Sequence, residues 1–441
     1  MGVSTDPVRK QIIIVGGGFA GVACARGLAK RPDVAVTLID QNDYHQFQPL
    51  LYQVATSMLA SADIAYPLRR IAAGFDAFHA RRAEVTAIDP AARSVTTATG
   101  ETYAGDYLVI AAGSQPNFFG TPGAEHAYPL YSLDDAQRLR TRIIETFEEA
   151  DRDPALIDQG AVDFVVVGGG PTGVEVAGAL AEMIATTMAH EFADFAGRAR
   201  VHLVNHGPAL LTMFADKAHA YAAGVLEKDD VDLRLGVGVT EIGPGHVTLS
   251  DGSTILTRCV IWGGGLKAAP VAGLSGLPIG AGGRIDVRSD LTVDGAPGVL
   301  AIGDVANIPD GKGGLHPQLG SVALQSGHAA AKTIAAQLDG KTTKPFSYLD
   351  KGTMAMIGRG AAVAQVPPGV ELHGKVAFAA WLGVHAALMT GGSNRVSAFK
   401  SWAEDFFGKE RAPQALDRSG APRMIWEEDE AAETAIAGGE A

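Results

Sequence analysis

The feature that most constrains this chain is a glycine-rich turn between two apolar runs in residues 11–40. The first run leads into Gly16, Gly18 and Gly21, a helix-like segment follows, and the second run ends at Asp40. Glycines at this spacing let the backbone approach a pyrophosphate at the start of a helix, and an acid that ends the second strand can bind a ribose hydroxyl. The opening residues therefore predict a strand, a turn, a helix and a strand that bind a dinucleotide.

The same pattern recurs in residues 163–182, where an apolar run leads into Gly168, Gly170 and Gly173. A second dinucleotide loop is therefore expected. The strand after this helix ends at Asn205, where the pattern usually has an acid. An amide still hydrogen-bonds a ribose hydroxyl but does not repel a 2′-phosphate, so we expect NADH to bind here and NADPH to remain possible.

A third signature, GVLAIGDVA at residues 298–306, contains Gly303 and Asp304 after an apolar strand. A carboxylate beside a glycine can accept a hydrogen bond from a ribityl hydroxyl, and this pattern far downstream of a first glycine loop is typical of flavin enzymes. Gly113 also follows a buried strand and permits close approach of the backbone to a ligand. We expect one bound cofactor, FAD, and one visiting nicotinamide nucleotide.

Composition limits the function classes. A chain of 441 residues with 47 % apolar residues can build two or three domains around a large core. The net charge of −13 argues against nucleic acid as a partner. The cysteines, Cys24 and Cys259, are far apart and form no C-x-x-C, so we expect buried thiols and no redox disulfide. The N-terminus lacks a secretory pattern, and no apolar run reaches 18 residues, so a cytoplasmic location is expected.

The expected fold class is α/β, with two Rossmann-like dinucleotide-binding domains, for FAD and NAD(P)H, and a small C-terminal helical region, which the family resemblance described below places at a membrane surface. The expected boundaries are 1–155 and 271–340 for the two parts of the FAD domain, 156–270 for the NAD(P)H domain, 341–415 for the C-terminal region, and 416–441 for a disordered acidic tail.

Several stretches together resemble the type II NADH dehydrogenases, single-chain flavoproteins that pass electrons from NADH to a quinone. They are VGGGFAG, HQFQPLLYQVATS, VVGGGPTGVEVAGALAEM, LAIGDVA, GTMAMIGRGAAVA and AWLGVHAALMTGGSNR, and they extend from about Val15 to Arg395. The family often has an A-Q-x-A-x-Q pattern behind the flavin, of which this chain keeps Ala323 and Gln325.

The resemblance implies a role for each site residue. FAD would contact Gly16, Gly18, Gly21, Asp40 and Asp304, and further candidates for cofactor binding are Gln48, Gly113, Gly303 and Ala323. The nicotinamide nucleotide would contact Gly168, Gly170, Gly173 and Asn205, and the quinone would approach near Gln325 and the stretch from Gln48 to Gln53. Glu175 would lie beside the nicotinamide and orient it or relay a proton, and Gln325 would hydrogen-bond a quinone oxygen. Some members pair the glutamate with a lysine, but no lysine of this chain matches that position. No metal site is expected.

The resemblance also implies the partners. They are a quinone (menaquinone or ubiquinone), a second copy of the chain in a homodimer, and the inner face of the cell membrane, on which amphipathic helices at 376–390 and 393–407 would rest. The alternative for these helices is packing on the protein or at a dimer interface.

Two other functions remain open at this point. One is a soluble NAD(P)H-dependent flavin reductase that serves another small molecule or a protein acceptor. The other is a redox sensor with weak catalysis, which the departures at Asn205 and Ser321 suggest. A sulfide:quinone reductase is disfavoured because paired catalytic cysteines are absent.

Overall fold

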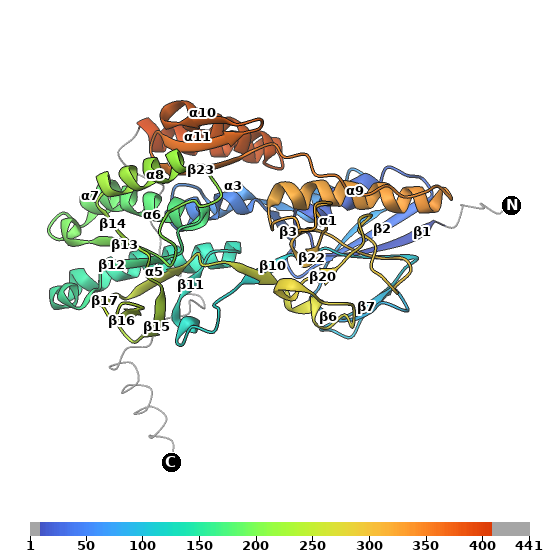
Figure 1. Cartoon of the computed structure of the whole chain (residues 1–441), viewed down its shortest axis with the longest axis horizontal. Helices are drawn as coiled ribbons and strands as arrows, with labels where there is room; N and C mark the ends of the chain where they lie inside the picture. Colours follow the sequence, from blue (N-terminus) through green and yellow to red (C-terminus); the bar gives the residue numbers. More distant parts are fainter. Residues whose placement is uncertain (1–8, 408–441) are drawn as a thin grey trace, which may run out of the picture. The chain divides into compact units, whose positions relative to one another are not determined.

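The computed structural model describes residues 9–407, and the tail predicted at 416–441 lies outside them (Figure 1). The chain forms two compact units, each built from separate segments. Of the described residues, the first unit contains 9–46, Ala65–Gln115 and Leu266–Lys351, and the second contains Phe47–Ile64, Pro116–Gly265 and 352–407. The domain boundaries expected from the sequence stay predictions.

The first unit is organised around a parallel sheet with the strand order β21-β9-β1-β2-β5. These strands are Val299–Ala301, Tyr107–Ile110, Lys10–Val15, Val34–Asp40 and Phe78–Arg82. Most side chains of β21, β9, β1 and β2 are buried, as expected for a parallel sheet, whereas the edge strand β5 is partly exposed. The carboxyl ends of parallel strands share one edge, so the residues that follow β1, β2, β9 and β21 gather there.

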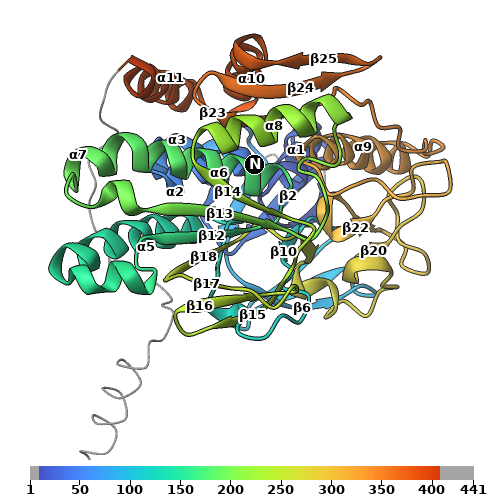
Figure 2. The same cartoon turned by 60° about the vertical axis from the view of Figure 1, so that its left-hand side comes forward.

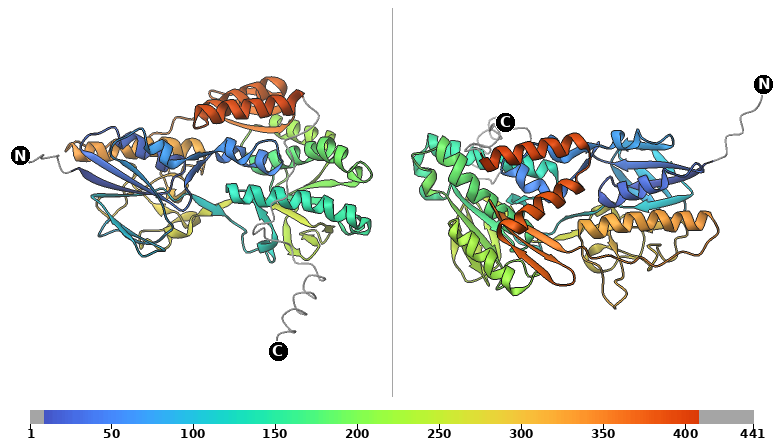
Figure 3. Two further views of the ribbon diagram at one scale, coloured as in Figure 1. Left: turned by 180° about the vertical axis from the view of Figure 1, so that it is seen from behind. Right: turned by 90° about the horizontal axis from the view of Figure 1, so that it is seen from above.

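Helices and shorter strands complete this unit. Helix α1 (Phe19–Leu28) packs along α9 (Gly320–Leu338), and Figure 3 shows the two side by side. Gly327 of α9 permits this contact, since a Cβ there would lie 2.2 Å from the carbonyl oxygen of Ala20. The remaining elements are α4 (Leu68–Ala72), the antiparallel strands β6 (Val85–Asp89), β7 (Ser94–Thr97) and β8 (Thr102–Ala104), and the pairs β3 (Tyr44–Gln46) with β4 (Ala65–Pro67) and β20 (Ile285–Asp286) with β22 (Ala306–Asn307).

The second unit repeats this sheet with the order β11-β18-β12-β13-β14, again parallel throughout. The strands are Tyr128–Pro129, Cys259–Trp262, Asp163–Val167, Arg200–Asn205 and Val231–Leu235. In both sheets the strand before the glycine loop is central, and the next strand along the chain lies beside it. The internal repeat and the α/β class predicted from the sequence are therefore confirmed.

The helices of the second unit include α5 (Leu133–Arg152), α6 (Pro171–Met183) and α8 (Asp216–Lys228). The unit also contains α2 (Leu51–Ala55), α3 (Ser61–Ile64), α7 (Ala189–Glu191), a π-helical stretch Ile184–Met188, and the antiparallel strands β15 (Val239–Gly243), β16 (His246–Leu249) and β17 (Thr254–Leu256). The short strands β10 (Ser114–Pro116) and β19 (Leu266–Ala268) pair with each other where the segments of the first unit end and begin.

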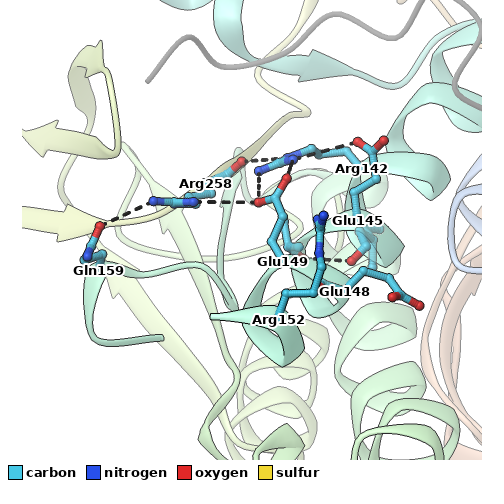
Figure 4. Close-up of polar contacts among 9 residues, drawn as sticks. Arg142, Glu145, Glu148, Glu149, Arg152, Gln159 and Arg258 are labelled. Carbon is cyan, nitrogen blue, oxygen red and sulfur yellow. Dashed lines mark hydrogen bonds and ion pairs between the residues drawn. The ribbon is translucent and has the colours of Figure 1, made fainter. Parts of the chain in front are cut away.

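A buried ion network ties α5 to the sheet of the second unit (Figure 4). The guanidinium of Arg142 donates to both carboxylate oxygens of Glu149, at 2.8 and 3.2 Å, and its Nε donates to the carbonyl oxygen of Arg258 at 3.2 Å. Because Arg142 is almost fully buried, these bonds replace the water that its charge would otherwise need. They fix α5 at the start of β18.

The C-terminal region forms a layer of the second unit. Strands β23 (Thr353–Gly358), β24 (Ala361–Val366) and β25 (Val370–His373) pair antiparallel, and helices α10 (Gly374–Leu388) and α11 (Gly392–Phe407) follow. Helix α10 packs on this small sheet and on α11, and the two helices lie side by side in Figure 2. Among the described residues, no helix is long and apolar enough to cross a membrane.

Candidate active site

The glycines of the first loop bring the backbone of the first unit into very close packing. Gly16 has φ +107°, and a Cβ at Gly21 would lie 1.8 Å from the carbonyl oxygen of Gly16. At Gly18, in contrast, a Cβ would meet no protein atom within 4 Å. Two glycines are thus required by the turn itself, while the third leaves open space at the start of α1.

Asp40 at the end of β2 completes the first loop. Its carboxylate accepts hydrogen bonds from the backbone N–H groups of Gly17, at 2.6 Å, and Asn42, at 2.7 Å. Burial raises the pKa of this carboxyl, and the two N–H donors oppose the rise. The residue expected to bind ribose therefore also holds the glycine loop against the strand.

Gly303 and Asp304 lie at the same edge of this sheet, as the sequence predicts. Gly303 has φ +69°, and its N–H donates to Ser326 Oγ at 3.1 Å. The Asp304 carboxylate accepts a hydrogen bond from Ser114 Oγ at 3.1 Å, and burial raises its pKa. Gly113, which follows β9, has φ +73°. The buried Ala323 lies against the Gly303 turn, where a larger side chain would displace it.

The second loop has the geometry of the first. Gly168 has φ +109°, and a Cβ at Gly173 would lie 1.8 Å from the carbonyl oxygen of Gly168. A Cβ at Gly170 would meet no protein atom within 4 Å. The correspondence between Gly16, Gly18 and Gly21 and these residues is complete.

Asn205 ends β13 as Asp40 ends β2, and its amide group makes three hydrogen bonds within the protein. Its Oδ1 accepts the N–H of Gly169 at 3.0 Å, and its Nδ2 donates to the carbonyl oxygens of Gly207 and Ala209, each at 3.0 Å. Both amide hydrogens are therefore used within the protein, and the side chain can still accept a hydrogen bond but has no hydrogen left to donate.

Both loops fit a dinucleotide. The residues before α1 and α6 make no side-chain capping hydrogen bond, and neither helix has an acid in its first turn. The free N–H groups and the helix dipole are thus available to a pyrophosphate, and the open space at Gly18 and Gly170 gives it room.

Glu175 lies on α6, one turn beyond the second loop. Its Oε1 accepts the backbone N–H of Met356, on β23, at 3.2 Å. Burial raises the pKa of this carboxyl to about 8, although the Met356 N–H and the indole of Trp381 oppose the rise. At neutral pH most of Glu175 is therefore protonated. An acid in this state can act as a proton donor near its operating pH.

Polar side chains connect Met356 to the C-terminal helices. Tyr52 Oη donates to the sulfur of Met356 at 3.2 Å and accepts from Gln53 Nε2 at 3.0 Å. Trp402 Nε1, on α11, donates to Gln53 Oε1 at 2.8 Å. Gln53 is fully buried. These contacts hold α2, β23 and α11 together beside Glu175.

A cavity of about 240 Å³ is lined in part by Met356 and Trp402. Its lining is mainly apolar and comes from α6, β23, α10 and α11, from the segment after α2 and from the turn after β23, with three charged side chains at its wall. The lining residues are Met58, Glu182, Met356, Arg359, Phe378, Leu382, Phe399, Trp402, Ala403, Asp405 and Phe406. Arg359 lies between the carboxylates of Glu182, at 2.9 Å, and Asp405, at 3.8 Å, so each of the three charges has an opposite charge beside it.

Two predicted residues have contacts that the sequence did not indicate. Gln325 is bonded twice to the backbone of Leu349, since its Nε2 donates to the carbonyl oxygen and its Oε1 accepts the N–H, both at 2.9 Å. Gln48 belongs to the second unit, where its Nε2 donates to the carbonyl oxygen of Tyr131 at 3.4 Å. Their roles toward quinone and FAD stay predictions.

The cysteines are confirmed as buried free thiols. Cys24 and Cys259 are both fully buried, and burial raises the pKa of each thiol to about 12. Neither thiol ionises near neutral pH, and neither is reactive.

The sequence alone missed three residues around Glu175, which are Met356, Trp381 and Trp402. Met356 and Trp381 lie within stretches that carry the family resemblance, GTMAMIGRGAAVA and AWLGVHAALMTGGSNR. Because these stretches are typical of the family, they indicated that this part of the chain matters for function. Nothing in them indicated which side chains face α6.

Comparison with known proteins agrees with this geometry. Residues 10–329 match the family model of the pyridine nucleotide-disulphide oxidoreductases. The chain is 36 % identical to the type II NADH:quinone oxidoreductase Ndh of Mycobacterium tuberculosis, over 92 % of this chain and 90 % of that protein, and 37 % identical to NdhA of the same organism, over 92 % and 89 %.

Solved structures show the same fold. The structure of NDH2 from Plasmodium falciparum in complex with NADH matches with a TM-score of 0.85 at 18 % identity, covering 92 % of this chain and all of that chain. The sulfide:quinone oxidoreductase of Aquifex aeolicus matches with a TM-score of 0.67 at 20 % identity, covering 94 % and 99 %. With its two glycine loops and its extended likeness to the mycobacterial proteins, the chain belongs to the pyridine nucleotide-disulphide oxidoreductase family and, within it, to the type II NADH:quinone oxidoreductases.

Proposed function

We propose that the protein is an FAD-dependent NADH:quinone oxidoreductase that does not pump protons. The observation that carries this proposal is the presence of two dinucleotide loops of matching geometry in one chain, at Gly16–Gly21 and Gly168–Gly173. An enzyme with one nucleotide site needs only one such loop. Two loops suit a bound flavin nucleotide and a nicotinamide nucleotide that reduces it.

The first loop and its edge residues, Asp40, Gly113 and Asp304, would hold FAD, and the second loop with Asn205 would hold NADH. Bound FAD supplies the redox chemistry, since it accepts a hydride from NADH and passes two electrons to a quinone. The chain's own residues bind the two pyrophosphates at the starts of α1 and α6 and orient the ribose groups. The expected boundaries, with the FAD domain at 1–155 and 271–340 and the NADH domain at 156–270, follow this division.

The buried thiols support an electron route without sulfur. Cys24 and Cys259 lie inside the two units with pKa values of about 12, so neither provides a thiolate for disulfide exchange. A quinone, which takes electrons directly, is the acceptor that suits this chain, and menaquinone and ubiquinone are both candidates.

Glu175 is the proposed proton donor. The overall reaction, NADH + H⁺ + quinone → NAD⁺ + quinol, takes up one proton from solution. A carboxyl that is mostly protonated at neutral pH and partly exposed can give up this proton and recover it from water. Its bond from the N–H of Met356 holds one oxygen in place.

The apolar cavity beside Met356 is the proposed approach for the quinone. Its aromatic and aliphatic lining suits an apolar ligand, and Tyr52 and Gln53 border it through their bonds to Met356 and Trp402. Gln325 stays a candidate for contact with a quinone oxygen, because one hydrogen of its amide is not used by Leu349.

We also propose that α10 and α11 rest on a membrane surface, which would be the inner face of the cell membrane. The exposed large apolar side chains of these helices include Val376, Val384, Leu388, Val396, Phe399 and Phe406. Exposed apolar faces of this kind mark interaction sites, and Lys375, Arg395 and Lys400 provide nearby positive charge. A homodimer remains an expectation.

Flotation with liposomes tests this attachment. We expect the double variant Val376→Glu, Leu388→Glu to lose flotation while keeping turnover with a water-soluble quinone, because both side chains are more than half exposed. Val370→Glu, at an exposed position of β25, is the matched control and should float like the wild type. Equal flotation of all three proteins would remove the membrane proposal.

Steady-state kinetics test the enzymatic function. The purified protein should oxidise NADH continuously with menadione and with a ubiquinone analogue. Turnover only with dye or ferredoxin-like acceptors would indicate the flavin reductase instead, and flavin reduction without turnover would indicate a sensor.

A further inference from the structure

Trp381, on α10, has a polar group whose partner is missing. The side chain is completely buried, and its indole Nε1 makes no hydrogen bond of normal geometry to any residue between 9 and 407. A buried N–H without a partner costs about 1–3 kcal/mol, so such a group calls for an explanation.

The ring of Trp381 is held firmly. It stacks on His385 with the ring centroids 4.0 Å apart, and it meets Trp402 edge to face at 6.0 Å. His385 is fixed in turn by a hydrogen bond between its Nδ1 and the carbonyl oxygen of Trp381, at 2.8 Å. The indole therefore cannot turn toward another acceptor without breaking this packing.

The acceptor that the indole influences is the carboxylate of Glu175. Desolvation sets the raised pKa of Glu175, and Trp381 and the N–H of Met356 are the groups that favour its ionised form. Charged groups on the neighbouring elements are occupied elsewhere. Arg359, in the turn after β23, is paired with Glu182 and with Asp405 of α11, and burial lowers the pKa of His385 to about 4, so that its ring is neutral.

We propose that Trp381 is a positioning residue for Glu175, whose carboxylate accepts the indole N–H when ionised and releases it when protonated. The pairing of Trp381 with Glu175 does not depend on the proposed function. Only its role during turnover rests on that function. When Glu175 loses its proton, one carboxylate oxygen keeps the bond from Met356 and the other takes the N–H of Trp381. When a proton returns from water, that bond opens again.

The wild-type protein offers a direct test through its four tryptophans. In protein labelled with ¹⁵N-tryptophan, one indole N–H signal should move with pH and share a midpoint with Glu175. Glu175→Gln should leave that signal fixed. If no indole signal titrates near the midpoint of Glu175, the proposed exchange does not occur.

Matched variants test the direction. Trp381→Phe keeps an aromatic ring but removes the N–H, so the titration midpoint of the Glu175 carboxyl, followed by its infrared C=O band, should rise by about 0.5–1 pH unit. Trp402→Phe removes a neighbouring indole N–H that is bonded to Gln53, and it should leave the midpoint unchanged. An unchanged midpoint in Trp381→Phe, or an equal shift in Trp402→Phe, would overturn the proposal.

These measurements also separate the inference from the proposed function. They follow the chain's own carboxyl without NADH or quinone, so a titrating indole in a protein that does not reduce quinones would sustain the pairing and refute the function. In an active enzyme, Trp381→Phe should extend kcat to higher pH, because Glu175 stays protonated longer, while KM for NADH stays unchanged.

Discussion

Replacing Gly170 by alanine should weaken NADH binding without harming the fold. Gly170 has φ −75° and ψ −179°, which alanine adopts freely, and a Cβ there meets no protein atom within 4 Å. Folding stability should therefore be unchanged or rise by up to about 1 kcal/mol, since alanine restricts the unfolded chain. The added methyl group would instead occupy the space assigned to the pyrophosphate.

The expected loss of NADH affinity is at least about tenfold, or 1.4 kcal/mol, because the displaced pyrophosphate also loses its contacts with the start of α6. The assay is NADH titration of the flavin-loaded protein, with flavin content and thermal unfolding measured on the same sample. Gly18→Ala, the equivalent change in the first loop, should lower FAD content instead.

Gly173→Ala is the contrasting variant in the same loop. Its Cβ would lie 1.8 Å from the backbone oxygen of Gly168, so the loop must shift, and stability should fall by several kcal/mol. A Gly170→Ala protein that folds normally and binds NADH with wild-type affinity would show that the dinucleotide does not lie at the start of α6.

Three further predictions concern other site residues. Both amide hydrogens of Asn205 are used within the protein, so this side chain has no hydrogen to donate to a 2′-phosphate. We therefore expect kcat/KM to be at least about tenfold higher for NADH than for NADPH, or 1.4 kcal/mol, and equal values would contradict this. Glu175 has a raised pKa of about 8, so between about pH 5 and pH 8 the native state binds more protons than the unfolded state. The free energy of unfolding should therefore fall as the pH rises from about 5 to 8, and Glu175→Gln should flatten this slope in urea unfolding experiments. Gln325→Ala should raise KM for quinone more than KM for NADH if the residue contacts quinone, whereas equal changes accompanied by lower stability would assign it only to its pairing with Leu349.

The two loops were predictable because their requirements are local. A turn that needs φ near +107° at Gly16 and +109° at Gly168 restricts these positions to glycine. The helix that follows each turn is formed by the residues next to it in the sequence. The acid at Asp40 was also expected, but its bond to the N–H of Gly17 was not, because that bond depends on how the loop folds over β2.

The surroundings of Glu175 could not be predicted in the same way. The groups that act on it, Met356 and Trp381, lie about 180 and 200 residues further along the chain, and only the packing of β23 on α6 and of α10 on β23 brings them close to it. A glutamate at this helix position therefore shows no sign of a raised pKa in the sequence. The pairing of Gln325 with the backbone of Leu349 was hidden for the same reason.

The central claim is that two nucleotides act through one flavin, and an anaerobic spectral titration tests it most directly. The purified protein should be yellow, one equivalent of NADH should bleach its flavin band, and one equivalent of menadione should restore it. A protein that cannot be loaded with FAD, or a yellow protein that NADH leaves unbleached, would contradict the account.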